Sequence, residues 1–207
     1  MPKTADSPML TRREAAEITG LSVGVLDKAI EQKIVTVYRR GNQSFLRSDD
    51  LAVVVLLQNT TLPLPTTIKR QIKRWVHDTK PYRATESAEL SISDALVIRW
   101  LPTASDTINA AETYAKLRDQ WIESDPQIKG GEPVIRGTRI GARGVAQRMD
   151  KGERVEALME DYPQIPAEVF RAARTYANAH PRRGRPVRPW RDSNEALDRR
   201  GPVASTR

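Results

Sequence analysis

Residues 11–30 read TRREAAEITGLSVGVLDKAI, and this stretch decides the fold of the front of the chain. Thr11 followed by Glu14 matches a capping box, the reciprocal pair of hydrogen bonds that begins a helix. Gly20 is placed to end that short helix, and Ser22 is placed to cap a second one. Two short helices joined by a tight turn that contains glycine form a helix-turn-helix pattern.

The residues that follow add a hairpin and a third helix to this pattern. Residues 34–38 are rich in β-branched side chains, residues 40–42 suit a tight turn, and residues 43–46 return as a second strand. Residues 48–59 open with Ser-Asp-Asp, whose acids favour the positive end of a helix. The order helix, turn, helix, hairpin, helix predicts a winged helix-turn-helix, and it resembles the DNA-binding domains of the MerR and excisionase type.

This resemblance implies that the second helix enters the major groove of DNA while the hairpin lies on the backbone. Reach and charge then select candidate DNA-contacting residues on the two helices and the hairpin tip: Arg12, Arg13, Ser22, Val23, Lys28, Arg39, Arg40 and Asn42. Asp27 and Glu31 on the second helix oppose this function, because the phosphates of a groove repel carboxylates. The alternative is a winged helix that serves as a protein-docking module.

Residues 66–80 (TTIKRQIKRWVHDTK) predict an amphipathic helix, capped by Thr66 or Thr67, after a proline-containing turn at residues 60–66. Its basic side chains are Lys69, Arg70, Lys73 and Arg74. They either lie along a phosphate backbone or coat a solvated helix face, and the sequence favours neither.

Charge is distributed unevenly along the chain, which contains 207 residues with 34 Lys and Arg, 26 Asp and Glu, and a net charge of +8. Residues 1–80 contain 13 basic and 8 acidic residues, and residues 181–207 contain 8 and 3. Residues 81–180 contain 13 and 15 and are nearly neutral. The two basic ends indicate that the partners are anionic, either nucleic acid or an acidic protein.

Several functional classes are excluded by composition. The absence of cysteine rules out a disulfide scaffold, a thiolate zinc site and cysteine catalysis. There is no run of about 18 apolar residues and no secretory leader at the start, so a cytoplasmic protein without a membrane span is expected. His77 and His180 stand far apart without spaced partners, and we expect no metal, no cofactor and no enzymatic activity.

The middle of the chain predicts a hairpin and a connecting helix. The hairpin turns at Ser93-Asp94, Pro102 stops it, and a helix runs from about Asp106 to Trp121. These elements contain no recognisable catalytic or ligand-binding pattern, and they suit either a dimer interface or a brace between domains.

The most specific sequence begins at residues 122–140, which read IESDPQIKGGEPVIRGTRI, and continues with DYPQI at residues 161–165. Glycine and proline break the chain around a short strand, and three short helices follow, which predicts a homeodomain-like unit. The two motifs resemble domain-of-unknown-function family 433, which is associated with antitoxins of bacterial toxin–antitoxin operons. With the winged helix in front, the chain is similar to a VapB-type antitoxin of the two-domain class.

The glycine-rich loop of this unit invites comparison with a phosphate cradle, but it lacks the endings of a P-loop and the spacing of a dinucleotide site. We therefore assign its residues structural roles, with Thr138 as a helix cap and Arg139 holding the loop: Gly130, Gly131, Gly137, Thr138 and Arg139. The acids of the second helix favour dimerisation and partner docking over DNA contact, although DNA contact by this unit stays open.

Residues 181–207 are rich in arginine and proline and are expected to be disordered when free. The antitoxin resemblance implies a nuclease partner of the PIN type, whose metal-binding carboxylates an extended arginine arm could satisfy. The candidate toxin-binding residues are Arg182, Arg183, Arg185, Arg188, Trp190 and Arg191. A solubilising tail, or one that binds nucleic acid without specificity, is the alternative.

Taken together, the sequence predicts a mainly helical protein with small β elements in four parts: a winged helix-turn-helix with a basic helix (1–80), a hairpin and helix (81–120), a three-helix unit (121–180) and a flexible tail (181–207). The expected function is that of an antitoxin of a type II system. It would bind a PIN-like RNase and, as a homodimer, repress its own operon at an inverted repeat. The alternative is a stand-alone transcriptional regulator or an excisionase-like factor without a toxin.

Overall fold

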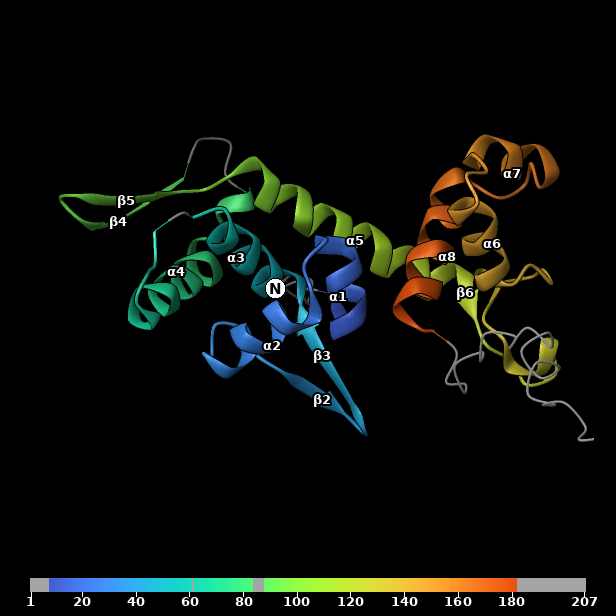
Figure 1. The fold of residues 1–207 in the computed structure, drawn as a ribbon, viewed down its shortest axis with the longest axis horizontal. Helices are drawn as coiled ribbons and strands as arrows, with labels where there is room; N and C mark the ends of the chain where they lie inside the picture. The colour runs from blue at the N-terminus through green and yellow to red at the C-terminus, as the bar shows by residue number, and fades with distance from the viewer. Residues whose placement is uncertain (1–7, 61, 84–87, 182–207) are drawn as a thin grey trace, which may run out of the picture.

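The computed structural model describes residues 8–60, 62–83 and 88–181. Over these residues the chain is mainly helical with small antiparallel sheets, which confirms the predicted fold class (Figure 1). None of the described helices combines the length and the apolar character that crossing a membrane requires.

The N-terminal unit (residues 8–58) combines three helices with a three-stranded antiparallel sheet of order β1-β3-β2. Its elements are β1 (Met9–Thr11), α1 (Arg12–Thr19), α2 (Val23–Glu31), β2 (Tyr38–Arg40), β3 (Gln43–Arg47) and α3 (Ser48–Gln58). The capping box of Thr11 and Glu14 is present, Gly20 ends α1 in the left-handed region, and the Ser22 side chain caps α2, as predicted.

The strand predicted at residues 34–38 is misplaced, because β2 begins only at Tyr38. Ile34 and Val35 are buried in the core and do not pair in a sheet. Helix α4 (Thr66–Thr79) confirms the predicted amphipathic helix. Its N-cap is Pro65, however, and neither Thr66 nor Thr67 caps it.

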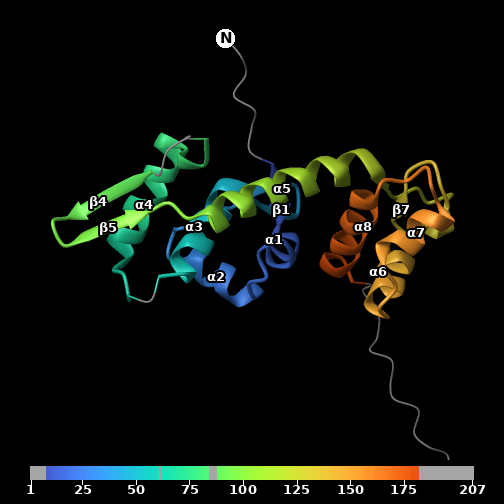
Figure 2. The ribbon, with the colours of Figure 1, turned by 90° about the horizontal axis from the view of Figure 1, so that it is seen from above.

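The β4–β5 hairpin (Glu89–Ser93 and Leu96–Arg99) projects from one end of the molecule, and α5 (Pro102–Trp121) leads from it to the other end (Figures 1 and 2). A short 3-10 turn at Pro81–Arg83 precedes the hairpin. Helix α5 starts at Pro102 and not near Asp106, because proline is well accommodated in the first turn, where its missing N–H is not needed.

The C-terminal unit (residues 122–181) contains a two-stranded sheet, a 3-10 turn and three helices. These are β6 (Ile122–Glu123), η2 (Lys129–Gly131), β7 (Val134–Ile135), α6 (Ala142–Asp150), α7 (Val155–Asp161) and α8 (Ala167–Ala179). The predicted helix cap at Thr138 is wrong, because α6 begins at Ala142 with Gly141 as its N-cap.

Two main apolar cores lie side by side and share helices. One is built on α1, α2, β3, α3 and α5 around Leu26, Leu46 and Leu51, and the other on α6, α7 and α8 around Phe170. Leu117 of α5 and Tyr176 of α8 pack against both cores. Helices α5 and α8 therefore join the two units.

Candidate nucleic-acid interface

The start of α2 is the exposed part of the helix pair. Gly20 has φ +69°, a conformation that allows the sharp turn out of α1. Leu26 and Ala29 bury the inner face of α2, which leaves Ser22, Val23 and Lys28 exposed, as required of residues that contact a ligand. Lys28 forms no ion pair with any residue that the structure describes.

The two arginines at the beginning of α1 differ in their partners. Arg12 Nη1 lies 2.6 Å from Asp27 Oδ1, so this salt bridge ties α1 to α2. It also compensates the charge of Asp27, one of the two acids that oppose DNA binding. Arg13 is exposed and has no acidic partner among the described residues.

The hairpin of β2 and β3 carries its polar side chains at the tip. Arg39, Arg40 and Asn42 are all exposed, and Gly41 between them has φ +55°. Neither arginine is paired with a described carboxylate. A hollow of about 720 Å³ separates the hairpin from α1 and α2, and Arg12, Arg39, Asp27 and Glu31 line it.

The buried carboxylate of Asp50, which the sequence placed only at a helix start, holds the entry to the hairpin. It accepts hydrogen bonds from the Thr36 backbone N–H at 2.8 Å and from His77 Nε2 at 2.9 Å. Lys73 Nζ lies 3.6 Å from the same carboxylate. Asp50 thus joins α3, α4 and the chain that leads into β2.

The basic side chains of helix α4 mainly form hydrogen bonds to other parts of the chain. Lys69 donates to the side chain of Gln32 at 3.4 Å, and Arg70 donates to the Gln32 carbonyl oxygen at 3.2 Å. Lys73 donates to Thr36 Oγ1 at 2.6 Å. These contacts place cations at the C-terminal end of α2, where the helix dipole favours positive charge. These hydrogen bonds give the basic face of α4 a structural role in addition to the two roles considered from the sequence.

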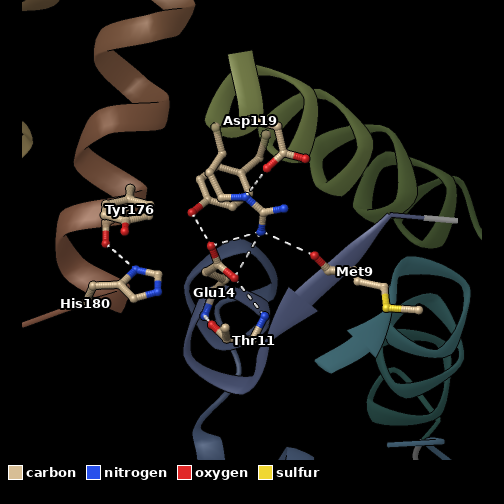
Figure 3. Close-up of polar contacts among 8 residues, drawn as sticks. Met9, Thr11, Glu14, Asp119, Tyr176 and His180 are labelled. Carbon is tan, nitrogen blue, oxygen red and sulfur yellow. Dashed lines mark hydrogen bonds and ion pairs between the residues drawn. The ribbon is translucent and has the colours of Figure 1, made fainter. Parts of the chain in front are cut away.

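A buried carboxylate at the first turn of α1 links that helix to α5 (Figure 3). Glu14 is 1% exposed and accepts from the Thr11 backbone N–H at 2.7 Å. Tyr114 Oη donates to Glu14 at 2.7 Å, and Arg118 Nη1 donates at 3.1 Å and also reaches the Met9 carbonyl oxygen at 3.3 Å. Glu14 thus adds polar contacts to the apolar packing that holds the N-terminal unit against α5.

The charge state of Glu14 follows from these contacts. Burial raises its pKa, but the positive charge of Arg118 and the hydrogen bonds from Thr11 and Tyr114 outweigh burial, so the pKa lies below its ordinary value. Burial and the charge of Glu14 raise the pKa of Tyr114. The cluster thus consists of a carboxylate, a guanidinium and a neutral phenol at neutral pH.

In the C-terminal unit the predicted loop glycines occupy turns. Gly130, Gly131 and Gly137 all have positive φ, at +65°, +81° and +73°. Thr138 stays within the loop, where its hydroxyl donates to the Ile135 carbonyl oxygen at 2.7 Å and accepts from the Ile140 N–H at 3.0 Å.

The loop is held by a different arginine from the predicted one. Arg139 is exposed and makes no hydrogen bond or ion pair within the described chain. Arg136 instead donates to Glu123 at 3.2 Å and to the Asp119 carbonyl oxygen at 3.4 Å. The I-R-G-T-R run does not distinguish its two arginines by spacing, so only the fold identifies the one that ties the loop.

Charged side chains of the C-terminal unit are mostly satisfied within it. Arg174 lies 2.8 Å from Asp150, and Arg148 bridges Glu153 and Asp161 across the α6–α7 turn. The hydrogen bond from Arg148 lowers the pKa of Glu153. Helix α8 therefore offers few free cations to a phosphate surface.

The candidate toxin-binding residues all lie outside the described residues: Arg182, Arg183, Arg185, Arg188, Trp190 and Arg191. The last described residue is Pro181, just after α8. Pro181 lines a hollow of about 590 Å³ together with Arg13, Ser22 and Val23.

Comparison with known proteins finds one family, described as "Protein of unknown function (DUF433)", which matches residues 122–177. The chain is 45% identical over 90 residues to "Uncharacterized protein y4eO" of Sinorhizobium fredii, a match that covers 44% of this chain and 40% of that protein. The chain thus spans about two fifths of the length of the curated relative it matches.

Among solved structures, the X-ray crystal structure of Rv2018 from Mycobacterium tuberculosis matches with a TM-score of 0.36 and 14% identity, over 81% of this chain and 98% of that one. This overlap is too loose to define the fold. The family match confirms the predicted DUF433 resemblance for residues 122–177.

Proposed function

We propose that this protein is a DNA-binding antitoxin whose N-terminal unit is a winged helix-turn-helix. The observation that supports DNA binding is a set of exposed basic side chains on α1, α2 and the β2–β3 hairpin that have no acidic partner in the described chain: Arg13, Lys28, Arg39 and Arg40. Unpaired cations gathered on one supersecondary unit are the electrostatic footprint expected of a nucleic-acid surface.

The order of elements supports the docking mode. In a winged helix, α2 enters the major groove and the hairpin rests on the adjacent backbone. Ser22 and Val23 stand at the exposed start of α2 and would approach base edges, whereas Arg39 and Arg40 would neutralise phosphates. The salt bridge of Arg12 with Asp27 reduces the repulsion that the Asp27 carboxylate would otherwise exert on the duplex.

Fluorescence anisotropy with the full chain tests DNA binding directly. A labelled duplex from the region upstream of its own gene is compared with a scrambled duplex of the same length over a range of salt concentrations. The intact protein should prefer the upstream duplex and lose affinity steeply with salt. Lys28→Ala should weaken binding, while Lys151→Ala, an exposed lysine of the C-terminal unit, should not; equal losses would contradict the proposed face.

The antitoxin part of the proposal is supported by the DUF433 match and the antitoxin association of that family. The three helices α6, α7 and α8 would form a homeodomain-like unit. Because Arg171 and Arg174 are paired internally, the face of α8 that carries them is better suited to dimerisation and toxin docking than to DNA. The basic segment after Pro181 would close the active site of a PIN-like RNase.

Co-expression with the product of the adjacent gene tests this part. We expect the two proteins to co-purify and the RNase activity of the partner to be suppressed. A chain truncated after His180 should restore the RNase activity of the mixture if the basic segment inhibits. A chain without a nuclease neighbour that still binds its upstream region would instead be a stand-alone regulator.

A further inference from the structure

A groove separates the first turn of α1 and the β2–β3 hairpin from the C-terminal unit. It has a volume of about 780 Å³, and its lining includes Arg12, Arg13, Gln43, Arg143, His180 and Pro181. We call it the inter-unit groove. Figure 3 labels Thr11 at the start of α1 and Tyr176 and His180 near the end of α8, which all line this groove.

Contacts on both sides hold the walls of this groove in place. Asn178 of α8 donates to Glu17 of α1 at 2.8 Å, which fixes the end of α8 against α1. Arg143 of α6 donates from Nη2 to the His180 carbonyl oxygen at 3.2 Å. The groove is therefore part of the packed structure and needs no rearrangement to exist.

The inter-unit groove differs in charge from the hollow on the other side of α1. Three arginines and a histidine line the groove, and no acidic residue is among its lining residues. The hollow between α2 and the hairpin contains Asp27 and Glu31 beside its two arginines. Arg12 pairs with Asp27, and Arg143 Nη1 lies 3.8 Å from Glu132, so Arg13 supplies the uncompensated positive charge by which the inter-unit groove complements an anion.

The chemistry of His180 suits an anion. Its Nδ1 lies 2.9 Å from the Tyr176 carbonyl oxygen, and because a carbonyl can only accept, Nδ1 must carry the proton. The ring also stacks on Tyr176 with centroids 4.2 Å apart. In a doubly protonated imidazole the second nitrogen, Nε2, is also a donor and can hydrogen-bond a phosphate oxygen.

The groove is continuous with the proposed DNA-contacting face. Arg13 and Pro181 line it and also line the adjacent hollow that contains Ser22 and Val23 at the start of α2. A duplex that placed its major groove on α2 would carry its backbone toward this side of α1. Helix α1 begins in the groove wall, with the positive end of its dipole there.

We infer that the inter-unit groove holds a backbone phosphate of the duplex that α2 contacts, so that the C-terminal unit is part of the nucleic-acid interface. This inference rests on the proposed DNA binding. Arg13 is the phosphate-contacting group on the N-terminal side and His180 is the group on the C-terminal side. Arg143 is a positioning residue, since it holds the end of α8.

Disulfide trapping tests the inference, because the chain has no cysteine of its own. Pro181→Cys places a thiol at the exposed end of α8 in the groove, and Pro163→Cys is the matched control at the end of α7. Each full-length variant is mixed with an upstream duplex that carries an activated disulfide on a backbone phosphate. Proximity should make trapping at position 181 about tenfold faster than at position 163.

Each of the other outcomes contradicts either the inference alone or the proposed DNA binding as well. If the unmodified protein binds the duplex but position 181 traps no faster than position 163, the inference is wrong and the proposed DNA binding stands. If the unmodified protein binds no duplex, the proposed DNA binding fails together with the inference. If a poly-glutamate chain with the same tether is trapped faster than the duplex, the groove accepts an acidic polypeptide and the inference is again wrong.

A second variant, checked by thermal unfolding, separates the loss of a phosphate contact from a loss of folding. His180→Gln keeps a donor for the Tyr176 carbonyl oxygen but cannot carry a charge. It loses the ring that stacks on Tyr176, so it should unfold at a somewhat lower temperature but stay folded at the temperature of the binding measurement, where the slope of log K against log salt becomes shallower by about 0.9, the value of one lost phosphate contact. An unchanged slope contradicts a phosphate at His180.

Discussion

Basic side chains of the N-terminal unit are largely exposed and unpaired, whereas those of the C-terminal unit are largely paired. Arg13, Lys28, Arg39 and Arg40 have no acidic partner among the described residues. In residues 122–177, every arginine except Arg139 forms an ion pair with a described carboxylate: Arg136, Arg143, Arg148, Arg154, Arg171 and Arg174.

This difference separates two uses of the same residue type. A paired arginine holds loops and helices together, and its charge is compensated before any ligand arrives. An unpaired arginine on a rigid element adds nothing to the fold and keeps its full charge for a partner. The number of basic residues alone would not have shown this, because residues 81–180 contain as many basic residues as residues 1–80.

The largest effect is expected at Glu14, the carboxylate that joins the N-terminal unit to α5. Glu14→Gln removes the negative charge from a buried pair and leaves the Arg118 guanidinium, which is 18% exposed, without its full compensation. The free energy of unfolding should fall by about 3 kcal/mol, as measured by urea denaturation. Glu31→Gln on the exposed face of α2 is the control and should change it by less than about 0.5 kcal/mol.

Acid should remove the stabilisation that the Glu14 carboxylate provides. The pKa of Glu14 is lower in the folded protein than in the unfolded chain, so its stabilisation is fully present above the unfolded value and is lost as pH falls through the folded pKa. We expect the denaturation curves of the unmodified protein and Glu14→Gln to converge as pH is lowered below about 4.5. Curves that stay parallel would show that Glu14 carries no such coupling.

The unpaired arginines of the hairpin should affect binding and not folding. Replacing Arg39 and Arg40 together by Ala removes two exposed cations that contact no described acid. The slope of log K against log salt should become shallower by about 1.8, which corresponds to two phosphate contacts, and affinity should fall for specific and scrambled duplexes alike. Loss of preference for the upstream duplex alone would mean that the hairpin reads sequence.

The smallest effect is expected at a paired arginine of α8. Arg174→Ala breaks an exposed salt bridge with Asp150, and such pairs contribute about 0–1 kcal/mol to stability. Duplex affinity should stay unchanged. A marked loss of affinity in anisotropy measurements would show that paired arginines also contact the duplex and would extend the interface from the end of α8 to the face that carries Arg174.

Local patterns in the sequence predicted local structure well. The capping box at Thr11 and Glu14 forms as expected, because both partners lie within one helical turn. Pro102 was interpreted as a stop although it opens α5, since proline ends one element and can also begin the next. Ile34 and Val35 predicted a strand because β-branched side chains serve both sheets and buried loops.

For the candidate site, the sequence predicted which side chains are exposed but not which groups they contact. Lys28, Arg39 and Arg40 are exposed, as helix periodicity and hairpin position indicated. The partners of Glu14, which lie about a hundred residues away on α5, could not be derived, because periodicity identifies a buried face but not the element that covers it. For the same reason, the sequence did not reveal that the end of α8 lies beside α1.

The continuity of α5 from Pro102 to Trp121 has a consequence for changes in chain length. Each residue inserted into a helix rotates everything after it by about 100° and advances it by about 1.5 Å. A single insertion between Tyr114 and Arg118 would therefore turn the guanidinium away from Glu14 and swing the C-terminal unit around the helix axis. Seven or eleven inserted residues would restore the helical phase but would still move Arg118 by about 10 Å or more along the axis, so the contact with Glu14 fixes the length of this segment as well as its phase.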